Sequence, residues 1–580
     1  MKTSHSFIEI LEARIAPATF TVTTIADTSN MAHDTGSLRD ALALADADPA
    51  SLDTIVFKLP PPVAPATENI IKLTGALSSK GNVTIKGPGA GKLIIDGDGG
   101  NTNQRVLLIN DLVNTTDSPT TISGVSIVNG HSTGDAGGIL SFESLTLKNV
   151  VISGNTAAVN AGGLKVQGDP VAGTKATISG SLITGNSAFS YGSGAEFLNL
   201  KSLTISKTTV TGNAATTANG SVGGGIYASI NATGTGMTIS GCQISDNKAG
   251  SGGGLSVANL NPDVKSLITI KSTKITGNTS ADTNVGTGGG GLIVGAGNTV
   301  ITGSTIQNNT AVLNGGGIAA SGFASLTISK CTISGNQTTD TNTAGQGGGG
   351  IFIQGTGTGT PKPATISGSI IANNRSAYYG GGVYALNGVA LTISSSTFSG
   401  NHAANGGGGL ATAGSGMGMQ VDLTVSGGAF SDNVAGLNGG GINATGDGVV
   451  SIMGSKVTGN LALNGGGIYA SSTKSVTVKK VVATGNVGSV GGGGLTLLST
   501  PDFEVSGGSF TGNGAGTGGG IFVQGSTGKI LGVAISGNAA NTRGGGVFQK
   551  NGGTVMLEIA KVIANSAPVD ADFSGTFTPV

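Results

Sequence analysis

The sequence predicts an all-β chain folded as a single-stranded parallel β-helix, a solenoid of about sixteen regular coils with several atypical coils at its N-terminal end. Three observations lead to this prediction. A segment of similar length recurs along most of the 580 residues, each copy closes with asparagine, and each contains short stretches of alternating apolar residues. A repeat of this length with strand-like contents corresponds to one coil of a solenoid.

The repeat ends in the pattern Ile/Val/Phe-Ser/Thr-Gly/Asp-Asn. These asparagines are Asn155, Asn186, Asn213, Asn247, Asn278, Asn309, Asn336, Asn374, Asn401, Asn433, Asn460, Asn486, Asn513, Asn538 and Asn565. Eight of the fourteen gaps between them are 25 to 27 residues, and an earlier, offset copy has Gly130 in this place. Asparagine tolerates left-handed backbone angles, and its side-chain amide can bond to the amides of neighbouring coils. We therefore interpret these residues as a structural ladder.

One copy, residues 315–336, illustrates the predicted coil. Its sequence, GGGIAASGFASLTISKCTISGN, contains three short strands with apolar residues at every second position. Stacking of successive copies predicts three parallel sheets, wound right-handed as parallel crossovers almost always are. The glycine triplet lies where a sharp corner requires positive φ and where a missing Cβ lets backbones approach closely.

The chain divides into four predicted parts. Residues 1–18 are a leader, 19–58 an N-terminal strand and capping helix, 59–566 the β-helix, and 567–580 a C-terminal tail. The helix is expected over residues 36–45, with Leu38, Leu42 and Ala45 on one face to cover the N-terminal end of the core. The strands expected around and after this helix span residues 20–24, 54–59, 70–73, 83–85, 93–95 and 106–109.

The composition of the chain excludes several classes of binding partner. Charged residues make up only 10% of the chain, and 29 Lys and Arg balance 29 Asp and Glu, which argues against nucleic acid as a partner. There is no apolar stretch of 18 residues, so no transmembrane helix is expected. The four histidines are scattered, and we expect neither a metal site nor a cofactor. The oligomeric state is left open.

Three motifs resemble those of known families. The segment Leu11-Glu12-Ala13-Arg14 is similar to the Leu-Glu-x-Arg leader of large surface proteins of planctomycetes, with Ala13 where proline is common. Gly-Gly-x-Ile/Leu paired with Phe-x-x-Asn, as in residues 398–401, resembles the repeat of the chlamydial polymorphic outer-membrane proteins. Residues 37–42, Ser-Leu-Arg-Asp-Ala-Leu, resemble the Cys-Ser-Leu-Arg-Glu-Ala motif of secreted bacterial β-helices, with Gly36 in place of the cysteine and Asp40 in place of the glutamate.

These resemblances imply a right-handed parallel β-helix of the pectin-lyase-like type, located outside a bacterial cell or on its surface. Enzymes of that type act on polysaccharides in a groove along one sheet. The strand after each glycine triplet is the natural place for such a groove here, because inserted loops flank it on both sides.

The residue one position past the inward Ile or Leu of this strand forms a column predicted to face outward. Six of its members are aromatic and are our candidate binding residues: Tyr227, Phe352, Tyr384, Tyr469, Phe522 and Phe548. Lys165 and Glu196 stand at one end of the column. The alternative is that the rings pack under the flanking loops or on one another.

Catalytic residues are not expected. Glycoside hydrolysis generally requires two carboxylates about 5–9.5 Å apart, and the column contains one, Glu196. A second candidate is a pair of equivalent loops, Asp282-Thr283-Asn284 and Asp340-Thr341-Asn342. They lie two coils apart, which places Asp282 and Asp340 about 10 Å from each other.

We therefore predict a non-enzymatic structural or adhesive β-helix, secreted or on the cell surface, with a polysaccharide or another cell-surface ligand as partner. The alternative is a polysaccharide lyase or glycoside hydrolase whose site lies in the inserted loops. A third hypothesis is a passenger in a larger adhesion system anchored by a separate protein. The fold alone does not decide among these functions.

Overall fold

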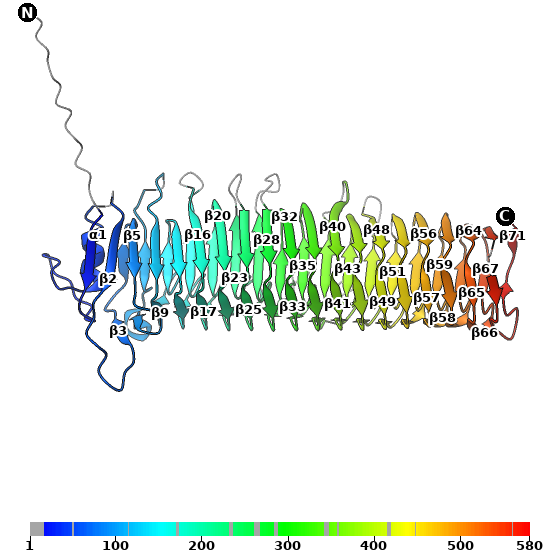
Figure 1. The fold of residues 1–580 in the computed structure, drawn as a ribbon, viewed down its shortest axis with the longest axis horizontal. Coiled ribbons are helices and arrows are strands. Elements are labelled where there is room, and N and C mark those ends of the chain that lie inside the picture. The colour runs from blue at the N-terminus through cyan, green and yellow to red at the C-terminus, as the bar shows by residue number, and fades with distance from the viewer. Residues whose placement is uncertain are drawn as a thin grey trace, which may run out of the picture.

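The structure, a computed structural model, is a long rod along which strands stack from one end to the other (Figure 1). It describes residues 17–48, 51–113, 115–169, 173–230, 236–259, 267–283, 288–340, 347–355, 359–414, 419–446, 448–558 and 561–579. Within these ranges the strands form four parallel sheets of 20, 18, 18 and 15 strands. The two helices found there are α1 (Leu38–Ala45) and α2 (Gly99–Thr102). The predicted all-β parallel solenoid is confirmed.

Each regular coil contributes one strand to each sheet. In one such coil the strands are β35 (Ile318–Ser321), β36 (Ser325–Ser329), β37 (Thr332–Ser334) and β38 (Gln337–Thr338). We call the sheets that contain them sheets C, A, B and D, in that order. β36 pairs in register with β40 (Lys362–Ser367), so that Leu326 lies opposite Ala364. Because alternate residues turn inward, one continuous apolar core extends from Val22 to Val555.

The sequence predicted three sheets, and the structure has a fourth, sheet D. Its 15 strands are mostly two residues long, such as β38, and follow the ladder asparagine directly. Two residues are too few to show an alternating pattern in the sequence. Sheet D therefore reads as a polar turn until the pairing of successive coils reveals it, for example Gln337 opposite Arg375.

The asparagine ladder forms as predicted. Asn336 donates through Nδ2 to Asn374 Oδ1 at 3.0 Å and to the carbonyl of Ile306 at 2.9 Å, and its backbone N–H bonds to the same Asn374 oxygen at 3.0 Å. The left-handed backbone was placed one residue too late, however. Positive φ occurs at the residue before each ladder asparagine, such as Gly335 (φ 65°) and Asn308 (φ 54°).

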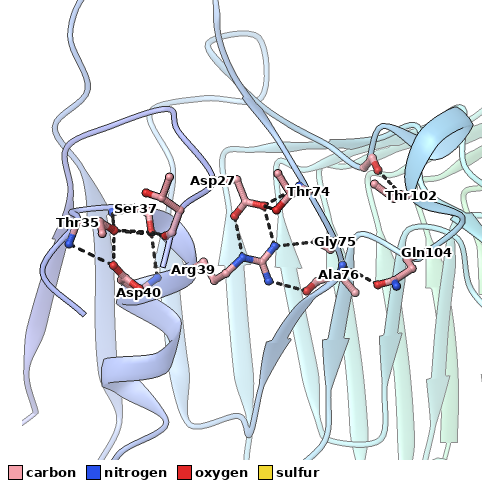
Figure 2. A network of polar contacts seen from close by, with 12 residues as sticks. Asp27, Thr35, Ser37, Arg39, Asp40, Thr74, Gly75, Ala76, Thr102 and Gln104 are labelled. Atoms are coloured by element: carbon pink, nitrogen blue, oxygen red, sulfur yellow. Dashed lines mark hydrogen bonds and ion pairs between the residues drawn. The ribbon is translucent and has the colours of Figure 1, made fainter. Parts of the chain in front are cut away.

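The N-terminal helix covers the end of the core, as expected. Ser37 caps α1 by accepting a hydrogen bond from the backbone N–H of Asp40 at 3.1 Å, and Leu38 and Leu42 belong to the continuous core. Arg39 binds the Asp27 carboxylate through two hydrogen bonds of 2.9 and 2.8 Å and donates to the carbonyls of residues 75 and 76 (Figure 2). The motif at residues 37–42 thus attaches the cap to the first coils.

Glycine at position 36 has a local cause. Its φ is 71°, and a Cβ there would lie only 2.3 Å from Thr23 Oγ1. A cysteine, which stands here in the resembled motif, does not fit this backbone.

The C-terminal residues continue the solenoid. Within the region predicted as a tail, β70 (Phe573–Ser574) pairs with β67 (Val547–Lys550) of sheet C, and β71 (Phe577–Pro579) pairs with β68 (Val555–Glu558) of sheet A. The rings of Phe573 and Phe577 lie 5.8 Å apart and pack against the core.

Candidate functional site

The predicted aromatic column lies on the face of sheet C that is turned away from the core. In β39 (Ile351–Gln354), Ile351 and Ile353 belong to the continuous core, whereas Phe352 packs in a separate cluster with Tyr384 and Ala411. The predicted strand phase is therefore correct, but the exposure of the aromatic rings to solvent was overestimated.

Four of the six rings are buried. The exposed fractions are 4% for Phe352, 2% for Tyr384, and 8% each for Tyr469 and Phe522. The prediction of an exposed column is wrong for these four, while Tyr227 and Phe548 are half-buried. Binding of a ligand by the column stays a prediction.

A second column of residues covers the rings. It consists of the residue before each glycine triplet, and we call it the wall column. Tyr379, one of its members, lies with its ring centroid 5.5 Å from that of Tyr384, and Tyr191 lies 5.1 Å from Tyr227. Phe352, with its ring centroid at 5.8 Å, also packs against Tyr384, so these rings lie on one another, as in the alternative weighed from sequence.

Near the C-terminal end the wall column borders a cavity. The members of the wall column here belong to four successive strands of sheet D, and each pairs with the next. They are Asn464 of β54 (Leu461–Asn464), Gly491 of β58 (Val487–Gly491), Thr517 of β62 (Gly514–Thr517) and Arg543 of β66 (Ala539–Arg543). Gly491, which has no side chain, lies beside Phe522. A cavity of about 460 Å³ is lined by Gly491, the largely buried Phe522 and the half-buried Phe548, and we call it the aromatic groove.

The groove has a floor and two walls. Its floor is Thr496, Phe522 and Phe548, which are paired across β59 (Leu495–Leu498), β63 (Ile521–Gln524) and β67. One wall is the wall column, and the other is Leu498, Gln524 and Lys550, stacked at the ends of the same three strands. The rings of Phe522 and Phe548 lie 5.6 Å apart at 56°. The groove therefore combines an aromatic floor with polar sides.

Lys165 and Glu196 are not accessible. Lys165 Nζ lies 2.8 Å from both Asp135 Oδ2 and Glu196 Oε2, and the side chains of Lys165 and Glu196 are almost fully buried. Burial raises the pKa of Glu196, and the charge of Lys165 opposes that shift only in part. Together with Asp135, these two residues form a buried ionic cluster on the outer face of sheet C.

Asp282 and Asp340 are two coils apart, since β30 (Thr279–Ser280) and β38 are separated by one strand, β34 (Thr310–Ala311). Asp282 is buried and accepts a hydrogen bond from the backbone N–H of Gly220 at 3.2 Å, which ties its loop to an earlier coil. Asn284, Thr341 and Asn342 of the two loops lie outside the described residues. A catalytic role of this pair stays a prediction.

Another cavity, of about 490 Å³, lies near the N-terminal end and is lined by Lys72, Asp96, Asp98, Asn129 and His131, among others. Its carboxylates already have internal partners. Asp98 pairs with Lys72 at 3.3 Å, and Asp96 accepts from Asn129 at 3.2 Å. Among the described residues no group of His, Cys, Asp and Glu could hold a metal ion, and no helix is long and apolar enough to cross a membrane.

Sequence reasoning missed a pair of neighbouring carboxyl groups, the buried Glu143 and the half-buried Asp111. Glu143 accepts hydrogen bonds from the backbone N–H groups of Asp111 (3.2 Å) and Ser118 (3.0 Å). Burial, with the charge of Asp111 adding to it, raises the pKa of Glu143 to about 7. Because both oxygens of Glu143 already accept backbone bonds, we interpret the pair as a clamp on the loop after β7 (Leu107–Ile109). No local motif marks it, because its members are 32 residues apart.

The pair predicts a pH-dependent stability. A carboxyl whose pKa is about 7 in the folded state and 4.5 in the unfolded state stabilises the fold below pH 4.5, and that contribution is lost as the pH rises through 7. Glu143→Gln cannot ionise, so we expect about 1–2 kcal/mol of this pH-dependent loss to disappear. Urea unfolding measured between pH 4.5 and 8 gives the slope. Glu504→Gln, at an exposed position, serves as the matched control. An unchanged slope in Glu143→Gln contradicts the assignment.

Comparison with known proteins agrees with the fold. A family model described as "Right handed beta helix region" matches residues 266–422 and 349–540, which together make up just under half of the chain. The chain forms a right-handed parallel β-helix. No curated protein matches the sequence.

Among solved structures, the chain is similar to tailspike protein 3 of bacteriophage CBA120, with 13% identity and a TM-score of 0.19. The alignment covers 92% of this chain and 60% of the tailspike chain. A score this low supports no statement about fold or ligand. The functional argument therefore depends on the groove.

Proposed function

We propose that this right-handed β-helix is a non-enzymatic protein, secreted or displayed on the cell surface, that binds a polysaccharide in the aromatic groove. The observation that carries the proposal is the cavity of about 460 Å³ lined by Phe522 and Phe548. Aromatic rings present flat apolar surfaces on which sugar rings can stack, and polar side chains beside them can bond to hydroxyl groups. Asn464 and Gln524 supply such amides here.

Binding without cleavage is favoured by what lines the groove. Its described lining contains no Asp or Glu, whereas hydrolysis of a glycosidic bond generally uses two carboxylates. A location outside the cell is supported by the resemblance of residues 11–18 to an export leader, most of which lies outside the described residues. Of the six predicted binding residues, the proposal uses Phe522 and Phe548.

The test closes the groove without disturbing the coil. Gly491 has no positive φ, and a Cβ there would meet Asn464 and Phe522 only at 3.6 and 3.8 Å, which is ordinary contact. Gly491→Tyr should place a ring beside Phe522 from the preceding coil, as Tyr191 lies beside Tyr227. We expect the affinity for the best ligand in a panel of neutral and acidic polysaccharides to fall at least about tenfold, or about 1.4 kcal/mol.

Gly514→Tyr is the matched control, because Gly514 faces open space on β62 away from the groove. Binding that survives Gly491→Tyr, or that both variants lose equally, contradicts a site in the groove. The same panel is scored for release of reducing ends. Cleavage of any polymer would support the alternative, a lyase or hydrolase acting from the inserted loops.

A further inference from the structure

The groove is positively charged at its C-terminal end. Arg543 ends β66 in one wall, and Lys550 ends β67 in the opposite wall. The two belong to the same coil, with Phe548 of the floor between them in sequence, and both side chains are exposed. A ligand lying over Phe548 therefore has a cation on either side.

These cations have no carboxylate partner in the part of the chain that the structure describes. None of the ion pairs found there involves Arg543 or Lys550, and no Asp or Glu lines the groove. Lys165, near the other end of the same sheet, is instead held between two carboxylates at 2.8 Å. The whole chain is neutral, with 29 basic and 29 acidic residues, so the charge at the groove is local.

The hydrogen-bond donors of these two cations also suit particular anionic groups. A guanidinium group presents its donors in a planar fork that matches a carboxylate or a sulfate, and an ammonium group binds the same anions as a point charge. A neutral polysaccharide leaves both cations without a counter-charge. An acidic polysaccharide can contact them while its sugar ring lies on Phe548.

Resting on the proposed function, we propose that the ligand of the aromatic groove is an anionic polysaccharide, whose carboxylate or sulfate groups bind Arg543 and Lys550. Asn464 and Gln524, farther along the two walls, bond to its hydroxyl groups. Such a contact between exposed charges weakens with salt, because the screening length is about 10 Å at 0.1 M ionic strength.

The experiment compares dextran, dextran sulfate and polygalacturonate binding to the full chain at two ionic strengths. Dextran and its sulfate share one backbone, so their difference reports charge alone, and polygalacturonate distinguishes carboxylate from sulfate. We expect at least one anionic polymer to bind about tenfold or more tightly than dextran, and salt to reduce the difference. Arg543→Ala/Lys550→Ala should remove most of that preference.

The matched control is Lys529→Ala/Lys561→Ala, which removes the same charge from exposed positions on β64 (Gly528–Leu531) and β69 (Lys561–Ile563), outside the groove. We expect it to change the affinity by less than about twofold. An equal loss in both double variants overturns the inference, because it indicates non-specific attraction. Dextran binding as tight as that of the anionic polymers overturns it too, while the proposed function stands. Binding of none of the polymers, neutral or acidic, overturns both.

Discussion

Replacing Asn433 by alanine is expected to lower the free energy of unfolding by about 3–5 kcal/mol. Asn433 is fully buried and stands in the middle of the asparagine ladder. Its Nδ2 donates to the carbonyl of Phe398 at 3.0 Å and to Asn460 Oδ1 at 2.9 Å. Its own Oδ1 accepts from the backbone N–H of Asn401 at 3.0 Å and from that residue's side chain at 2.9 Å. Alanine removes all four of these bonds and leaves the buried backbone N–H of Asn401 without its acceptor, while Asn460 Oδ1 keeps the bond from the backbone N–H of residue 433.

Urea unfolding of the full chain measures the loss, and amide hydrogen exchange localises it to neighbouring coils, since solenoid stability is roughly a sum of local terms. Asn219→Ala, at an exposed position, is the control and should change stability by less than about 0.5 kcal/mol. A loss at Asn433 no larger than in this control would show that the ladder bonds contribute little beyond those made to water.

Replacing Gly440 by alanine is expected to cost at least about 2 kcal/mol, or to prevent the coil from closing. Gly440 is the middle residue of a triplet. A Cβ there would lie 2.4 Å from the carbonyl oxygen of Gly466 and 2.6 Å from that of Leu461. Both are backbone atoms of the neighbouring coil. Neither oxygen can move away from the added Cβ without disrupting the pairing of the sheets.

The unfolding midpoint in urea and the amide exchange of residues 434–494 report this effect. The control is Gly514→Ala, because Gly514 also lies in a strand but has nothing within 4 Å of the added Cβ. We expect that change to be neutral or slightly stabilising. Equal stability of both variants would contradict close approach as the reason for the triplet.

Features that repeat along the sequence could be predicted from it, whereas very short strands and contacts between distant residues could not. The ladder asparagines and the triplets repeat once per coil, so the coil and the strand phase of sheet C could be derived from spacing alone. Sheet D could not, because strands such as β38 contain only two residues. The clamp between Glu143 and Asp111 also had no local signal.

The candidate site was predicted in part. The six rings were correctly placed on one face of sheet C, but their exposure depends on side chains brought together from neighbouring strands and coils. Tyr379 packs against Tyr384, whereas Gly491, which has no side chain, lies beside Phe522 in the lining of the groove. Spacing within a strand contains no information about these contacts.

The sequence by itself determined the architecture: a parallel β-helix with an asparagine ladder, glycine corners and a helical cap of Ser37 to Ala45. It did so because a solenoid buries its core through contacts between equivalent positions, which a repeat displays directly. Only the tertiary structure decided which part of the aromatic column is open. That depends on the size of side chains brought together from different strands and coils, as Gly491, Phe522 and Arg543 are at the groove.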